Sequence, residues 1–363
     1  MLRPATLTDL DRLVEIETLC FLHDRISRRS FRHLITRGHG AVLVVEHGGL
    51  VVGELVILVN DSTSLARVYS LGVDPAHRRQ GHATALLGRA EDWVKEAGFF
   101  FIRLEVGSQN AAAINLYAKF GFRQFGRWQG YYADDDDALR MEKRLRTLAA
   151  HQRTNVPYYE QTLAFSCGPA ALMMAMKALA PDLVLDRGLE VRLWREATSV
   201  FMTAGHGGTT PFGLAVAAAR RGFAAAVYAS GPRPLFGDSV RSDDKRAVIA
   251  LTEEDYVAEM RERGIPLYEA APDLAALTAA LADGAVVVVL ISTWRLYRER
   301  APHWVVLTGF DAEHIYIHDP WIDPNMDYGA VDKVNIPIRR DEFARMMRYG
   351  RGQTQTALII RTG

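Results

Sequence analysis

The sequence predicts two α/β units: first a mixed sheet flanked by helices, then an α+β unit in which helices precede strands. Its 363 residues exceed the usual size of one domain, and 49% are hydrophobic, enough for two packed cores. Strand and helix patterns alternate up to about residue 145. Residues 147–155 then become polar and lose periodicity. We therefore expect a first unit at 1–147, a linker at 148–155 and a second unit at 156–363.

The elements of the first unit follow from hydrophobic patterning. Residues 41–47 form an apolar strand that ends at Gly48-Gly49, a hairpin turn, and residues 50–59 return as its partner. Further along, the pattern predicts strands at 65–73, 100–106 and 138–145 and helices at 81–97 and 110–120. In the second unit it predicts a helix after Cys167, another at 211–221, and strands at 284–292, 303–310 and 314–320.

Charge and composition exclude several classes of protein. The 43 basic residues balance 43 acidic ones, which argues against a broad nucleic-acid or acidic-membrane surface. The longest apolar run, 285–291, is far shorter than a membrane span. Two cysteines, Cys20 and Cys167, are too few for a disulfide framework and lack zinc-site spacing. We expect a cytoplasmic protein without a metal site, a membrane partner or a nucleic-acid partner.

A ligand site is predicted where the strand 65–73 joins the helix 81–97. Small residues at Gly81 and Ala83 let a ligand approach the backbone. The unpaired N–H groups of residues 78–83, together with the positive end of the helix dipole, suit a pyrophosphate. Taken alone, the same turn also fits a tight connection without a ligand.

The segments that follow make the pattern specific. After Arg78-x-x-Gly81-x-Ala83 comes the strand ending LEV, and then N-x-x-A-I-x-L-Y-x-K-F-G-F from Asn110. Over residues 2–145 this resembles the GNAT acetyltransferases, and within them it is similar to the ribosomal-protein-alanine acetyltransferases. The resemblance implies acetyl-CoA as cofactor and a peptide or protein amine as acceptor.

The resemblance also assigns residues. It implies that the pyrophosphate lies on the amides of Arg78, Arg79, Gln80, Gly81, His82 and Ala83, with Asn110 as a further contact and the pantetheine arm beside Leu71 and Val73. Tyr117 is the implied general acid, and Glu105 the implied general base, acting directly or through a water. Alternatives stay open: Tyr117 as a core residue, Glu105 as a structural acceptor, Asn110 as a helix N-cap, and His82 as an exposed residue without a catalytic role.

A second constellation centres on Cys167. The cysteine opens a helix whose first turn contains Pro169, and the helix dipole there favours thiolate. Six residues earlier stands Gln161, an amide donor able to share an oxyanion with the N–H of Cys167. His303 opens one strand and Asp319 ends the next, so adjacent strands would bring the two together. Nucleophile, base and orienting carboxylate are thus predicted.

These residues resemble the family-39 cysteine peptidases, the papain-like group that includes double-glycine leader peptidases. Gln161, Cys167-Gly168-Pro169, His303-Trp304 and Asp319-Pro320 carry the resemblance, which spans about 155–325 and implies a papain-like fold. Ser166 departs from it, because the family usually has an acidic residue there. The transmembrane and ATP-binding unit of the exporters also has no counterpart in this sequence. The simplest alternative is that Cys167 is a small buried residue at a helix start.

Three interpretations of function remain. The first is a bifunctional enzyme, an N-acetyltransferase joined to a cysteine peptidase. The second keeps the transferase and makes the second unit a peptide-binding module that does not cleave. The third is a small-molecule amine acetyltransferase with a regulatory domain. The acceptor, the cleavage specificity, the coupling between the units and the oligomeric state do not follow from the sequence.

Overall fold

The protein is described by a computed structural model covering residues 1–22, 25–60, 63–132, 136–145, 152–198, 207–237, 242–297, 299, 301–321 and 333–363. It divides into two compact units, Met1–Thr147 and Leu148–Gly363. Residues 148–151 of the predicted linker lie outside the described part. Within the described part, every helix is too short or too polar to cross a membrane.

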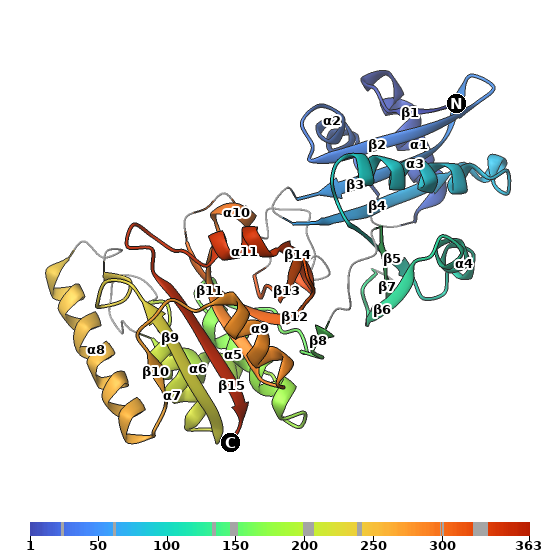
Figure 1. Cartoon of the computed structure of the whole chain (residues 1–363). Helices are drawn as coiled ribbons and strands as arrows, with labels where there is room; N and C mark the ends of the chain where they lie inside the picture. The colour runs from blue at the N-terminus through green and yellow to red at the C-terminus, as the bar shows by residue number, and fades with distance from the viewer. Residues whose placement is uncertain are drawn as a thin grey trace. The chain divides into compact units, whose positions relative to one another are not determined.

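The first unit is one mixed sheet with helices on both faces (Figure 1). Its strand order is β1-β2-β3-β4-β5-β7-β6, and of these neighbours only β4 and β5 run parallel. The predicted α/β class is confirmed. The elements are β1 (Leu2–Pro4), η1 (Leu7–Asp9), α1 (Leu10–Cys20), α2 (Arg28–Thr36), β2 (Gly40–His47), β3 (Leu50–Val59), β4 (Leu65–Val73), η2 (Pro75–His77), α3 (His82–Glu96), β5 (Phe101–Gly107), α4 (Ala111–Lys119), β6 (Arg123–Trp128) and β7 (Ala138–Arg144).

Helices cover both faces of β3, which explains why its sequence is apolar along almost its whole length. Leu55 and Ile57 belong to the core that contains α3, which packs on β2, β3 and β4. Val56 points the other way, into the core formed with α1 and α2. Figure 1 shows α3 lying across these strands. A residue of β3 therefore faces one of two distinct interiors.

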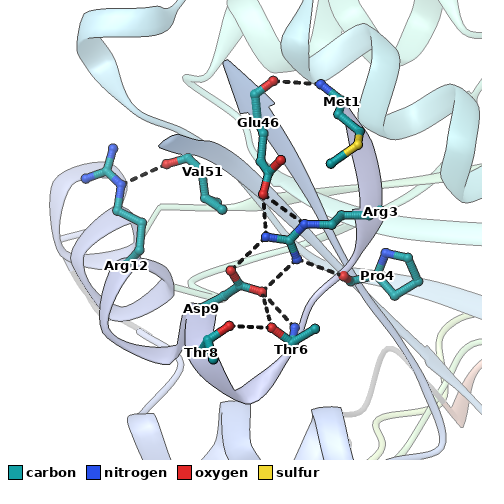
Figure 2. Close-up of polar contacts among 9 residues, drawn as sticks. All are labelled: Met1, Arg3, Pro4, Thr6, Thr8, Asp9, Arg12, Glu46 and Val51. Carbon is teal, nitrogen blue, oxygen red and sulfur yellow. Dashed lines mark hydrogen bonds and ion pairs between the residues drawn. The ribbon is translucent and has the colours of Figure 1, made fainter. Parts of the chain in front are cut away.

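A half-buried ion-pair network connects β1 to the rest of the sheet (Figure 2). Arg3 on β1 donates to both carboxylate oxygens of Asp9, at 2.8 and 2.9 Å, and also to Glu46 of β2. Thr6 closes the turn by donating its N–H to Asp9 Oδ2 at 2.7 Å. The Arg3 hydrogen bond, offset in part by burial, holds the pKa of Asp9 at about 2. Beside this network, Arg12 of α1 donates to the carbonyl of Val51, so α1 is tied to β3.

The second unit is a mixed sheet of order β10-β9-β15-β11-β12-β13-β14, with β8 beside β12. Its elements are β8 (Gln152–Arg153), α5 (Cys167–Leu179), α6 (Arg187–Ala197), α7 (Pro211–Ala219), β9 (Phe223–Ser230), α8 (Asp243–Glu262), β10 (Leu267–Tyr268), α9 (Leu274–Ala282), β11 (Val286–Ser292), α10 (Trp294–Tyr297), β12 (Pro302–Phe310), β13 (His314–His318), β14 (Ile336–Arg339), α11 (Arg340–Met346) and β15 (Gln355–Thr362). The expected order of helices before strands holds only in part, since α8 and α9 lie between strands.

Helices also cover both faces of the second sheet. Along β11, Val286 and Val288 face the core that contains α5, α6 and α7. Val287 and Val289 face the opposite core, with α9 and α11. The apolar run that the sequence shows at 285–291 is thus a strand buried on both faces. Helix α5, which begins at Cys167, lies inside the first of these cores.

Candidate active sites

The start of α3 is an open cradle of backbone N–H groups. Gly81 is the N-cap residue and adopts a left-handed φ of 82°, while Arg79 has a φ of 63°. The N–H groups of residues 79–83 have no hydrogen-bond partner among the described residues. Nothing lies within 4 Å of the position that a Cβ on Gly81 would occupy. Such a nest, with the helix dipole behind it, binds anions.

One prediction about this cradle is wrong. The N–H of Arg78 was expected to be unpaired, but it reaches the carbonyl of Pro75 at 3.5 Å as η2 ends. The Arg78 side chain turns back to β4, where its Nε donates to the carbonyl of Val73 at 3.2 Å. Cys20 Sγ donates to the same carbonyl at 3.3 Å. Arg78 therefore braces the end of β4, and the row of unpaired amides begins at Arg79.

His82 also differs from expectation, because it is half-buried rather than exposed. Its ring lies edge-on to His47, with 5.6 Å between ring centroids, and His47 lies 6.0 Å from His77. Burial lowers the pKa of His82, and the charges of His47 and His77 lower it further. The neutral form of the His82 imidazole is therefore favoured at the first turn of α3.

Beyond the cradle, β4 and β5 separate. The two parallel strands pair only from Leu65–Phe101 to Arg67–Arg103, although β4 continues to Val73 and β5 to Gly107. Between its pairings with Val56 and Ile57 of β3, strand β4 has a register shift that skips Tyr69. Such a bulge bends a strand away from its neighbour. Leu71 and Val73, both predicted to contact the cofactor, lie on the diverging part of β4.

Tyr117 on α4 is buried in the core shared with α3, and its ring contacts Phe122 edge-on at 5.8 Å. Burial raises the pKa of Tyr117 well above its ordinary value, and the charge of Glu54 raises it further. The phenol therefore keeps its proton throughout the physiological range, as a general acid must. Asn110, the residue before α4, accepts the N–H of Ala113 at 3.1 Å and so caps the helix.

Glu105 is held by an arginine that the sequence analysis missed. Arg67 Nε donates to Glu105 Oε2 at 2.8 Å, and Arg67 Nη2 donates to the Tyr131 hydroxyl at 3.1 Å. Burial raises the pKa of Tyr132, and the charges of Tyr131, Glu105 and Tyr117 raise it too. Tyr132 thus lies near both predicted catalytic groups. An arginine inside the apolar strand 65–73 was the sequence signal for this cluster.

In the second unit the structure brings Cys167, His303 and Asp319 together. His303 Nε2 lies 2.6 Å from Asp319 Oδ1, across the paired ends of β12 and β13. The Cys167 thiol, partly exposed, is hydrogen-bonded to the imidazole and to the N–H groups of Trp304 and Gly168. The sulfur therefore has one ionisable partner and two backbone donors.

The three groups carry shifted pKa values. Burial opposes ionisation of Cys167, but the hydrogen bond and charge of His303 outweigh it and hold its pKa below the ordinary value. Burial likewise opposes the imidazolium, but Asp319 raises the pKa of His303 to about 10. Against burial, the charges of His303 and Lys333 lower the pKa of Asp319 to about 2. These shifts favour a thiolate–imidazolium pair beside an ionised Asp319 over a neutral thiol and imidazole.

Three further residues fix the carboxylate. Tyr297 donates its hydroxyl to Asp319 Oδ2, and the buried Lys333 donates to Tyr297. The N–H of Trp321 donates to Asp319 Oδ1 at 2.9 Å. Neither Tyr297 nor Lys333 was predicted, because no local pattern connects them to Asp319.

Gly168 follows the cysteine because the site has no space for a side chain. A Cβ at Gly168 would lie 2.0 Å from Thr209 Oγ1 and 3.0 Å from Trp304 Cδ1. Trp304 in turn donates its indole N–H to the carbonyl of Thr209 at 3.3 Å. The first turn of α5 is therefore packed tightly against β12 and the residue that precedes Thr210, the N-cap of α7.

Gln161, the predicted oxyanion donor, is fixed beside the same strand end. Its backbone N–H donates to the carbonyl of Pro320 at 2.9 Å, and the Tyr158 hydroxyl donates to the carbonyl of Asp319 at 3.1 Å. Gln161 Nε2 donates one hydrogen to the carbonyl of Leu163 at 2.8 Å. An amide nitrogen carries two hydrogens, so the second is left for a ligand.

The departure at Ser166 has a structural counterpart on α6. Glu190 is fully buried and accepts the Ser166 hydroxyl, the Thr162 N–H at 2.8 Å, the Thr162 hydroxyl at 2.7 Å and the Tyr159 hydroxyl at 3.0 Å. The residue before Cys167 is therefore hydrogen-bonded to a carboxylate, although this carboxylate belongs to α6 and not to the same segment. No sequence pattern connects Glu190 to Cys167.

His318 faces away from the nucleophile, as the strand alternation predicts. Its Nε2 lies 2.8 Å from the carbonyl of Val156, and its Nδ1 accepts the N–H of Asn335 at 3.0 Å. Both ring nitrogens are thereby used, and the imidazole is a buried link between β13 and the start of the unit.

Comparison with known proteins agrees with this division. Residues 10–122 match the Acetyltransferase (GNAT) family, and residues 156–361 match the Peptidase_C39 like family. An N-alpha-acetyltransferase of Sulfurisphaera tokodaii is 32% identical over 151 residues, which are 39% of this chain and 90% of that protein. A putative [ribosomal protein bS18]-alanine N-acetyltransferase of Bacillus subtilis is 30% identical over 141 residues, 38% of this chain and 91% of that protein. The crystal structure of the Escherichia coli ribosomal-protein-S18-alanine N-acetyltransferase aligns with 44% of this chain and 99% of its own, at 25% identity and a TM-score of 0.38.

Proposed function

Since the chain belongs to the Acetyltransferase (GNAT) family in its first unit and to the Peptidase_C39 like family in its second, we propose a bifunctional enzyme. The first unit is an N-acetyltransferase, and its acceptor is the amine of a peptide or protein. The second unit is a cysteine hydrolase that cleaves peptide bonds. The arrangement of Cys167, His303 and Asp319 carries the second activity.

The cofactor of the first unit is acetyl-CoA, which supplies an acetyl thioester. The cradle at the start of α3 fits its pyrophosphate. Among the described residues nothing pairs with the amides of residues 79–83, and no described atom lies near the position of a Cβ on Gly81. The diverging part of β4, with Leu71 and Val73, borders the path from this cradle to Tyr117. Tyr117 Oη holds the proton that a leaving thiolate needs, since burial keeps the phenol neutral. Glu105, with Oε2 on Arg67, is the proposed base.

The acceptor class rests on the relatives. Two of them are named for N-alpha-acetylation and for acetylation of an alanine on a ribosomal protein. An α-amine at the start of a polypeptide is the group that these names share. We take a peptide with an N-terminal alanine as the first acceptor to assay.

In the second unit, the Cys167 thiolate attacks a peptide carbonyl and forms a thioester with release of the amine. His303 Nδ1 faces the sulfur, because Nε2 is engaged by Asp319, so the imidazolium delivers its proton to the leaving amine. The neutral imidazole then takes a proton from water, whose oxygen attacks the thioester. The second hydrogen on Gln161 Nε2 and the N–H of Cys167 are the proposed oxyanion donors.

The alternative of a binding module that does not cleave is less well supported. It rested on Ser166, which replaces the acidic residue usual before the nucleophile. Glu190 supplies a buried carboxylate at this place through its hydrogen bond with Ser166. Since the nucleophile, base and orienting carboxylate are also in contact, we favour hydrolysis.

Intact-mass analysis of a peptide library tests both activities at once. With acetyl-CoA present, peptides beginning with alanine gain an acetyl mass, and Tyr117→Phe lowers that rate. Without acetyl-CoA, a subset of peptides loses residues, and Cys167→Ala abolishes that loss. When acetyl-CoA is supplied, Cys167→Ala still acetylates. Cleavage that persists in Cys167→Ala, or a library without any cleaved peptide, would refute the hydrolase. Acetylation that Tyr117→Phe leaves unchanged would remove Tyr117 from the acid role.

A further inference from the structure

A buried pair of carboxyl groups in the first unit has no role in the chemistry described so far. Glu54 interrupts the apolar strand β3 and is fully buried, and Glu17 of α1 is 1% exposed. Ser70 of β4 joins them: its Oγ lies 2.8 Å from Glu17 Oε1 and 2.9 Å from Glu54 Oε1. Three oxygens from three elements thus form one chain.

The geometry of this chain fixes its proton content. The Ser70 hydroxyl has one hydrogen, so it can donate to only one of the two carboxyl groups. The contact with the other is a hydrogen bond only when that carboxyl carries a proton and donates to Ser70 Oγ. The chain Glu17–Ser70–Glu54 is therefore complete when it holds one carboxyl proton.

The surroundings place that proton on Glu54. Burial raises the pKa of Glu17, but the N–H of Ile26, which Oε2 accepts at 3.1 Å, and the charge of Arg25 both oppose that rise. Glu54 Oε2, in contrast, has no hydrogen-bond partner among the described residues. Burial, together with the charge of Glu17, raises the pKa of Glu54 to about 8. The ionisable groups that face Glu54 are Glu17 and Cys20 of α1 and Tyr117 of α4.

The chain also lies at the transfer site. Glu54 pairs in register with Gly72, between the predicted cofactor contacts Leu71 and Val73. A Cβ on Gly72 would lie 3.0 Å from Glu54 Oε1 and 3.5 Å from Cys20 Sγ. Ser70, which is partly exposed, lies on the part of β4 that has left β5. Ser70 contacts Glu17 of α1, whereas the amides of the cofactor cradle begin α3, on the opposite face of the sheet. We therefore expect the acceptor to approach from the face that α1 covers.

We propose that Ser70, Glu17 and Glu54 form a proton relay that takes the first proton from the acceptor ammonium, with Ser70 as the group that touches it. Glu105 remains the base for the second N–H proton, which is lost as the amine attacks. This rests on the acetyltransferase activity proposed above. In the step, the ammonium N–H bond breaks and its proton passes to Ser70 Oγ. The hydrogen of Ser70 passes to Glu17 Oε1, and the amine keeps the electron pair with which it attacks. The relay gains one proton, which it later returns to solvent.

The first test needs no acceptor or cofactor. Infrared difference spectra of the full-length protein at pH 7 are expected to show the C=O band of a neutral carboxylic acid that Glu54→Gln removes. Glu91→Gln is the matched control, since Glu91 is a buried carboxylate of α3 paired with Lys143. The control is expected to keep the band. Wild-type protein without this band, or a band that Glu54→Gln leaves in place, would overturn the relay.

The second test compares two amines that differ in the need for a base. With an alanine-starting peptide, Glu17→Gln, which removes the proton acceptor of the relay, and Ser70→Ala are each expected to lower kcat/KM about a hundredfold. Ser70→Thr, which keeps the hydroxyl, is expected to retain most of the rate. With methoxyamine, which is already neutral at pH 7, the same variants are expected to fall less than about threefold.

Equal losses with both amines would mean that Glu17 and Ser70 only support the fold, and would contradict the relay. If the wild-type protein acetylates neither amine, the proposed transferase activity fails. The infrared result then still decides whether the three oxygens hold a proton.

Discussion

Both units build their sites at the start of a helix, but they use it in opposite ways. At α3 the backbone amides are open, and the space over Gly81 is empty. At α5 the corresponding glycine, Gly168, is packed against Thr209 and Trp304. The N–H groups of Gly168 and Trp304 donate to the sulfur of Cys167. The helix dipole favours an anion at both places: we propose a diffusible one at α3 and the Cys167 thiolate at α5. The residues packed around the first turn of each helix decide whether the anion is a bound ligand or a side chain of the protein.

The largest expected difference between the two helix starts is the loss of stability when a glycine there is replaced by alanine. Gly168→Ala places a Cβ 2.0 Å from Thr209 Oγ1, and such overpacking costs about 3 kcal/mol. Gly81→Ala meets no atom but must adopt a φ of 82°, which costs about 1 kcal/mol. Urea unfolding, with fluorescence followed for each transition, measures both. Equal losses for the two variants would show that the two helix starts are packed alike.

A smaller effect concerns thiol reactivity. Because His303 lowers the pKa of Cys167, alkylation by iodoacetamide at pH 6 is expected to be fast in the wild type. Without that cation, burial favours the neutral thiol, so His303→Ala is expected to slow labelling by at least about tenfold. Cys20 is the internal control: burial raises its pKa, so it reacts slowly in both proteins. Peptide mapping by mass spectrometry distinguishes the two sites. Labelling of Cys167 that His303→Ala leaves unchanged would refute the ion pair.

The smallest effect tests a purely structural carboxylate in the first unit. The folded-state pKa of Asp9 is about 2, below its ordinary 3.8. Its stabilisation is therefore present above about pH 4 and lost as the pH falls toward 2. Asp9→Asn is expected to lower the stability of the first unit by about 1 kcal/mol at pH 7 and to flatten this acid limb. Thermal unfolding of both proteins from pH 2 to 7 measures this difference in stability. The unfolding transition of the second unit is expected to be the same in the two proteins.

Much of the fold could be predicted because the patterns are local. The hairpin at Gly48-Gly49 and the helix starting beside Gly81 follow from neighbouring residues and confirm the mixed α/β class. Strand β9 could not be predicted in this way. Its sequence, FAAAVYAS, is rich in alanine, which favours helices, and it becomes a strand because β15 pairs along its whole length. Tertiary pairing overrides local preference there.

The candidate sites likewise contain some residues that the sequence could predict and others that only the fold reveals. Cys167, His303 and Asp319 could be proposed from residue types and order along the chain, and the structure brings them into contact. Their catalytic roles stay predictions. Glu190 and Lys333 gave no signal, because each reaches its site from an element with no sequence relation to it. Glu54 did leave a signal, a charged residue inside an apolar strand, but its partners Glu17 and Ser70 are visible only in the fold.

The position of β15 has a consequence for synthesis on the ribosome. This strand, Gln355–Thr362, is near the end of the sequence yet pairs with both β9 and β11 in the middle of the second sheet (Figure 1). A nascent chain that has emerged only as far as Asp319 already carries the whole predicted triad, but the two halves of its sheet are unjoined. Strands β9 and β11 are joined only through β15, so this sheet becomes continuous after all of its other strands have been synthesised.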